Sequence, residues 1–193
     1  MDNTTTGRGR LATGAVAAAA LLLAGAGCNT LTSKSSGESA KADGEITVPT
    51  GYAGWPKFVP TVDKDKAGQV REIYINDTGL KAKRGEAFPS GTVSVMEIYT
   101  ARKDGSGNLQ RDAEGRLVKD KLDKVFVMAK GAGWGQALRA GTVATGDWVY
   151  SAYQADGTTP ATSDFSKCRG CHVPLASDDY IARYSEHFDT RKN

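Results

Sequence analysis

Stretches of the chain alternate apolar and polar residues with the two-residue period of a β-strand. The clearest is QVREIYIND, residues 69–77, which places Val70 and Glu72 on one face and Arg71 and Ile73 on the other. Its β-branched residues and its Asn-Asp-Thr-Gly ending favour a strand that stops at a turn. We therefore predict a strand here, with one face turned toward a core.

Three more strands are predicted downstream, in 88–103, 123–135 and 146–157. The charged, glycine-containing segment 103–117 between the first two of these is typical of a hairpin loop. Successive strands joined by turns favour an antiparallel sheet.

Helical periodicity is weak until SDFSKCRGCH (163–172) and SDDYIARYSEHF (177–188), which both open with Ser-Asp, a helix-start signal. The predicted fold class is mainly β: an antiparallel sheet with short helices and a C-terminal helix that carries two cysteines.

The N-terminus has the features of an export signal. Arg8 and Arg10 precede an apolar run, residues 11–26, that is too short for a spanning helix. Small residues precede Cys28, as in the lipobox of bacterial lipoproteins, so we predict a signal peptide over 1–27 and lipidation of Cys28. The alternative is a plain secretory signal with an incidental cysteine.

Residues 28–44 lack aromatics and are rich in Ser, Lys, Ala and Gly, which favours a flexible tether; the folded domain is predicted over 45–193. The expected location is the periplasm, with the protein held to a membrane by its lipid. The formal charge of +3 comes without a dense basic block, so no nucleic-acid partner is expected.

The chain has three cysteines and two histidines, and Cys168-Arg169-Gly170-Cys171-His172 contains three of these five residues. Cys-x-x-Cys-His is the pattern of covalent c-type haem attachment. The thiols add to the two haem vinyl groups, and the histidine that follows binds the iron. This predicts one haem c, joined through Cys168 and Cys171, with His172 as the proximal ligand.

Three other uses of these residues stay open. A zinc site needs two further ligands, and His187 is the one other His or Cys outside the N-terminal segment. A thioredoxin-like redox motif needs a βαβ setting that the pattern does not predict. A structural disulfide is favoured by an oxidising compartment.

The order REIYIN, FPSGTVSVMEIY, GAGWG and CRGCH followed by SDDY resembles the cytochrome P460 and cytochrome c′-beta family, from about Tyr52 to the C-terminus. The resemblance implies an antiparallel β fold with haem against the sheet, homodimers, and His172 as proximal ligand. P460 proteins have a haem-linked lysine in a pattern like GTVxVKE, and hydroxylamine oxidation depends on it. Met96 stands in that slot, so the enzymatic interpretation loses its main support.

Met96 is therefore the predicted sixth ligand, because a methionine thioether is an ordinary haem ligand; it is otherwise a pocket-lining residue. Met128 and His187 are weaker candidates, the first expected in the core and the second on an exposed helix face. Arg71 matches a family strand with a haem-side arginine, so it is a candidate for a propionate or the distal side. Lys130 is the nearest spare lysine, outside the motif slot.

Three functions follow as hypotheses. The first is an electron carrier with a His/Met haem that serves periplasmic redox partners. The second is a gas-binding protein, above all for nitric oxide, with Met96 displaced or the iron open. The third is an enzyme that oxidises hydroxylamine or acts on peroxide, which needs an open iron and a proton-handling group.

Overall fold

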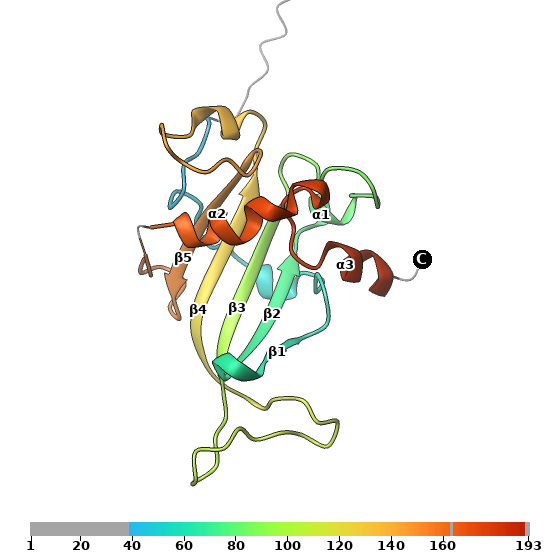
Figure 1. Ribbon diagram of the computed structural model, residues 1–193, viewed down its shortest axis with the longest axis vertical. Helices are drawn as coiled ribbons and strands as arrows, with labels where there is room; N and C mark the ends of the chain where they lie inside the picture. The colour runs from blue at the N-terminus through green and yellow to red at the C-terminus, as the bar shows by residue number, and fades with distance from the viewer. Residues whose placement is uncertain (1–38, 163, 192–193) are drawn as a thin grey trace, which may run out of the picture. The chain divides into compact units, whose positions relative to one another are not determined.

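The computed structural model describes residues 39–162 and 164–191, which contain a five-stranded antiparallel sheet and short helices (Figure 1). The strands follow chain order across the sheet: β1 (Val62–Lys64), β2 (Gln69–Ile75), β3 (Val93–Ala101), β4 (Lys119–Lys130) and β5 (Trp148–Gln154). This confirms the mainly β fold. The last four strands overlap the four predicted ones. β1 was not predicted, because its few residues are too short a run for alternation to be visible.

One face of the sheet carries a row of apolar residues across four strands. Ile73, Met96, Phe126 and Ala152 are successive cross-strand partners from β2 to β5. Because side chains alternate along a strand, the residues two positions away in each strand share this face. This is the face that α2 (Ser166–His172) crosses in Figure 1.

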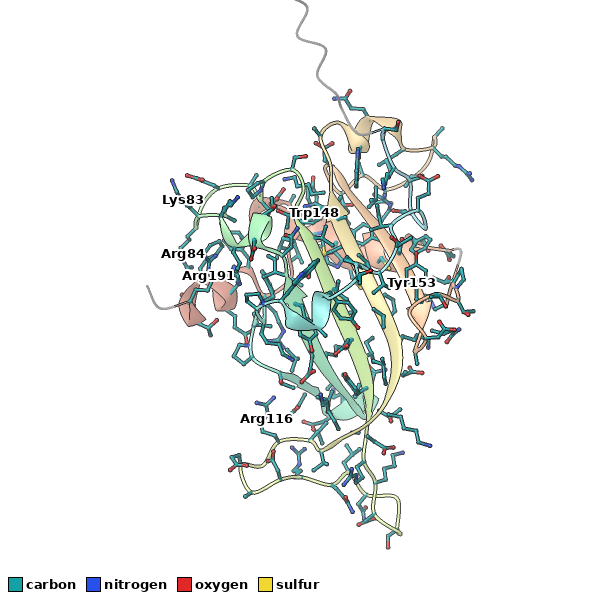
Figure 2. The ribbon with its side chains drawn as sticks, turned by 180° about the vertical axis from the view of Figure 1, so that it is seen from behind. Lys83, Arg84, Arg116, Trp148, Tyr153 and Arg191 are labelled. Atoms are coloured by element: carbon teal, nitrogen blue, oxygen red, sulfur yellow. The ribbon has the colours of Figure 1, made fainter. Side chains whose placement is uncertain are left out.

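The other face is covered by the N-terminal part of the domain, which Figure 2 shows from behind. Ile46 and the 3₁₀ helix η1 (Tyr52–Gly54) pack there with Val95 and Val125. Glu97 lies on this side too, 6% exposed, and three tyrosine hydroxyls donate to its carboxylate: Tyr52, Tyr74 and Tyr99. Glu97 thus faces away from the row that contains Met96, and its buried charge is satisfied by hydrogen bonds.

Residues of the turn after β2 position the start of β3. Asn76 caps α1 (Asp77–Leu80), because its side-chain oxygen accepts from the amide of Gly79 at 3.0 Å, and it also accepts from Val93 at 3.1 Å. A Cβ at Gly79 would lie 2.4 Å from the Ile75 side chain, so only glycine fits. The predicted end of the strand before Asn76 is thus confirmed, and the predicted turn is the one-turn helix α1.

The C-terminal part contains three short helices. α2 ends at His172, the 3₁₀ helix η4 (Val173–Asp178) follows, and α3 covers Tyr184–Thr190. The helical pattern of 177–188 is realised in part, as the end of η4 and most of α3, because Asp179, Tyr180 and Arg183 have left-handed backbone angles that interrupt it. The remaining 3₁₀ helices are η2 (Asp65–Ala67) and η3 (Trp134–Ala137).

The predicted signal peptide, Cys28 and most of the predicted tether lie outside the described residues. The last residues of that tether contact the sheet: the Gly44 amide donates to the Tyr150 carbonyl at 2.7 Å. Within residues 39–162 and 164–191, the helices are all too short or too polar to cross a membrane.

Candidate functional site

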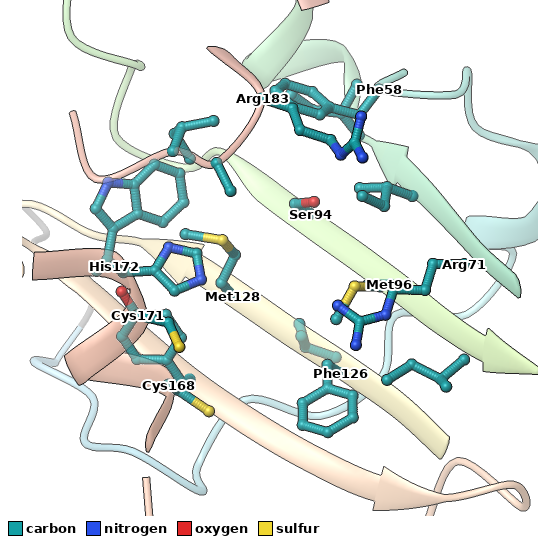
Figure 3. Close-up of a pocket in the computed structure, with 18 of the residues that line it drawn as sticks. Phe58, Arg71, Ser94, Met96, Phe126, Met128, Cys168, Cys171, His172 and Arg183 are labelled. Atoms are coloured by element: carbon teal, nitrogen blue, oxygen red, sulfur yellow. The ribbon is translucent and has the colours of Figure 1, made fainter. Parts of the chain in front are cut away.

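A cavity of about 470 Å³ lies between α2 and the apolar face of the sheet (Figure 3). Its wall is mainly apolar and includes Ile73, Phe126, Met128, Trp148, Tyr150 and Ile181. The five residues predicted to contact a cofactor also line it: Arg71, Met96, Cys168, Cys171 and His172. The fold therefore brings together residues that are up to 101 positions apart in the chain, from Arg71 to His172.

His172 is oriented by a hydrogen bond to the backbone. Its Nδ1 lies 2.6 Å from the carbonyl oxygen of Tyr180, which can only accept, so Nδ1 carries the ring proton. The other ring nitrogen, Nε2, is then unprotonated and free to bind a metal. Burial lowers the pKa of His172, which further favours the neutral ring that metal binding requires.

The two cysteines are three residues apart on α2, which places their side chains on one side of the helix. Cys168 is half-buried and Cys171 is exposed, and both are free thiols. Burial raises the pKa of Cys168, so its thiol stays protonated at neutral pH. The helix thus presents two thiols and the unprotonated Nε2 of His172 to the same cavity.

Arg169, between the cysteines, was not predicted to have a role. It is 1% exposed, and its Nε and Nη2 each donate to Asp43 at 2.8 Å. Nη1 also donates to the carbonyl of Val143 and the hydroxyl of Thr145, both at 3.1 Å. This network fixes α2 to Asp43 and to the loop that precedes β5, and so fixes the position of the thiols.

We expect Asp43→Ala to destabilise the protein by about 3–5 kcal/mol, because it leaves the Arg169 guanidinium buried without its carboxylate. The midpoint of urea unfolding measures this. Asp65→Ala is the control, since it breaks an exposed ion pair with Arg111 and should cost less than about 1 kcal/mol. Equal effects of the two substitutions would contradict the structural role of Arg169.

Arg71 places a positive charge on the cavity wall. Its Nε is buried and has no hydrogen-bond partner among the described residues, while Nη2 donates to Gln69 at 3.1 Å. Burial, and then the nearby positive charge of Arg183, lower the pKa of Arg71. Arg183 lines the same cavity. A buried donor without an acceptor, beside a second guanidinium, is suited to an acidic group on a bound molecule.

Two methionines line the cavity at different places. Met128 pairs with Tyr150 across β4 and β5, and the Tyr150 ring centroid lies 5.3 Å from that of His172. Met96 is on β3, one strand farther from β5. Figure 3 shows Met128 beside His172 and Met96 beside Arg71. The expectation that Met128 lies in the core omitted this position: it packs on the core and also faces the cavity.

The placement of His187 on an exposed helix face was wrong. His187 is fully buried, its ring stacks on Phe58 with centroids 4.0 Å apart, and its Nδ1 lies 2.6 Å from the Phe58 carbonyl. It is absent from the residues that line the cavity. Lys130 is not spare, because its ammonium group lies 2.8 Å from a carboxylate oxygen of Asp179.

The described part of the chain contains no cluster of three or more His, Cys, Asp or Glu side chains that could hold a metal ion, so the zinc alternative has no ligand set there. The model of the cytochrome P460 family matches residues 49–183, which is most of the chain and includes CRGCH. The chain belongs to the cytochrome P460 family. This membership implies a haem c protein. No curated protein matches the chain significantly.

The cavity fits the haem that cytochrome P460 membership implies. The apolar walls suit a flat apolar ring system, the free Nε2 of His172 suits iron, and the unpaired Nε of Arg71 suits a propionate. These features are present in the residues themselves, independently of the family match.

Proposed function

We propose that this cytochrome P460 family member is a mono-haem c-type cytochrome that acts in electron transfer, nitric oxide binding or both. Cys168 and Cys171 hold the haem by thioether bonds, and His172 binds the iron. The observation that carries the proposal is the free Nε2 of His172, which shares one apolar cavity with both thiols of α2.

Bound in this cavity, the haem supplies a one-electron iron couple. The residues of the chain hold it in place and control its surroundings. The Tyr180 carbonyl keeps the proton of His172 on Nδ1, so that Nε2 stays a ligand in both oxidation states. Ile73, Phe126 and Trp148 give the cavity apolar walls, and Arg71 offers its guanidinium to an acidic edge.

A thioether from the sheet is proposed as the sixth ligand, which would raise the reduction potential. Met96 is favoured by its place in the lysine slot of the family. Met128 is favoured by its register next to Tyr150 and hence by its nearness to His172. Leucine substitution at each position distinguishes them, as the Discussion describes.

Nitric oxide binding is the second candidate, supported by the apolar wall that Phe126 and Ile73 form in the cavity. Such a wall admits a small uncharged gas. Hydroxylamine oxidation has less support, since Met96 occupies the lysine slot and Lys130 is paired with Asp179. Peroxide chemistry would need a proton-handling group in the cavity.

The cellular setting is part of the proposal. Export and lipidation of Cys28 would tether the domain to a membrane in the periplasm, where c-type attachment takes place. A homodimer is proposed from the family, and redox partner proteins from the carrier role.

The absorption spectrum of the ferric holoprotein, produced in an export-competent host, tests these roles. A low-spin spectrum with a weak far-red sulfur-to-iron band is expected for the carrier. A high-spin spectrum without that band would move gas binding ahead of electron transfer. The absence of any haem spectrum would overturn the proposal.

A further inference from the structure

The proposed function does not explain a buried ion pair next to the haem motif. Lys130, the last residue of β4, places Nζ 2.9 and 2.8 Å from the two carboxylate oxygens of Asp179. Each side chain is only 12% exposed. Burying two opposite charges adds little net stability, so such a pair is weak evidence for stability and a candidate for a positioning role.

Asp179 begins a strained turn. Asp179 has φ 52° and Tyr180 has φ 62°, both in the left-handed region that non-glycine residues rarely adopt. The turn is held from several sides: Asp179 also accepts from the Phe88 amide at 2.8 Å, and the Tyr180 amide donates to Leu175 at 2.8 Å. Strained backbone persists only where its surroundings determine it in this way.

This turn determines where the Tyr180 carbonyl lies. The Tyr180 carbonyl accepts the Nδ1 proton of His172 at 2.6 Å. A continuous set of contacts therefore runs from the sheet at Lys130, through Asp179 and Tyr180, to His172. Lys130 does not stand at the family's position for the haem-linked lysine, which Met96 occupies. It is also absent from the residues that line the cavity.

We propose that the Lys130–Asp179 pair is a positioning device for the proximal histidine. It holds the turn so that the Tyr180 carbonyl keeps the Nδ1 proton of His172, and thereby sets the bond to iron and the reduction potential. The inference rests on the proposed role of His172. Donation from Nδ1 makes the imidazole a stronger ligand and favours ferric iron, which lowers the potential.

Lys130→Met removes the charge and keeps the length of the side chain. We expect the hyperfine-shifted Nδ1 proton of His172 to exchange with solvent about tenfold faster, because losing a hydrogen bond of about 1.4 kcal/mol changes the opening equilibrium about tenfold. The reduction potential should rise in the same variant. Lys130→Arg keeps a cation that can pair with Asp179, so it should restore both properties most of the way.

Because Lys130→Met leaves Asp179 buried and unpaired, a second variant protects the test against misfolding. Lys130→Met/Asp179→Asn removes both charges, and asparagine tolerates the left-handed angle and can still accept from the Phe88 amide. Arg116→Met is the matched control, since it breaks the ion pair with Asp63 near β1. The control should leave the proton exchange and the potential unchanged.

Unchanged proton exchange and potential in both the single and the double variant would overturn the inference while the haem remains in place. A shift of the same size in Arg116→Met would also overturn it, since that shift would reflect general destabilisation. Wild-type protein without a His172-ligated haem would instead refute the proposed function, so the two failures are distinguishable.

Discussion

A variant with both Cys168 and Cys171 replaced by alanine is expected to release all of its haem into acidified organic solvent, whereas the wild type releases none. The two thiols lie on one side of α2 and line the cavity, so they are the attachment points that the chain offers there. The fold should survive, because Cys168 is only half-buried and Cys171 is exposed. Haem staining after denaturing electrophoresis measures the covalent fraction.

Cys28→Ala is the matched control, since it removes the third cysteine of the sequence. It should leave covalent haem unchanged and abolish lipid attachment. Retention of covalent haem in the variant that lacks Cys168 and Cys171 would contradict the proposed attachment.

Met128→Leu is expected to remove the far-red sulfur-to-iron band and lower the reduction potential, and Met96→Leu to leave both largely unchanged. Met128 is the cross-strand partner of Tyr150, which contacts His172. Neighbouring strands are about 4.8 Å apart, so Met96 on β3 begins one such step farther from β5. The two spectra and potentiometric titrations decide between the residues.

The two leucine variants control for each other, because both replace methionine by an apolar residue of similar volume at a cost below about 1.5 kcal/mol. Loss of the band in Met96→Leu, with the band retained in Met128→Leu, would assign the ligand to the position in the family's lysine slot. A haem protein whose wild type lacks the band would refute thioether ligation at both positions.

The sheet could be predicted from the sequence because its information is local. Alternation in 69–77 gave both the strand and the correct faces for Arg71 and Ile73. The CRGCH spacing likewise marked the thiols and the histidine on one helix. Such patterns are visible wherever neighbouring residues determine the structure.

The contacts that position the site could not be predicted, because their partners are distant in sequence. Arg169 and Asp43 are 126 residues apart, and Lys130 and Asp179 are 49 apart. His187 was expected on an exposed helix face. It is buried because the loop that carries Phe58 packs on it, which only the tertiary fold determines.

Strand register bears on the choice between Met96 and Met128, which the leucine variants test. The family resemblance predicted Met96 as the sixth ligand. The pairing of Met128 with Tyr150 is a property of the assembled sheet and has no pattern in the sequence. Sequence patterns show that a side chain faces the core, but not which neighbour it meets there.

We propose that haem is bound covalently at Cys168 and Cys171. The most direct test is the intact mass of the denatured protein, purified from a host that exports proteins and attaches haem. We predict the mass of the processed chain, with the lipid on Cys28, plus one haem. A mass equal to the processed chain alone, or to that chain less two hydrogens from a Cys168–Cys171 disulfide, would contradict the account.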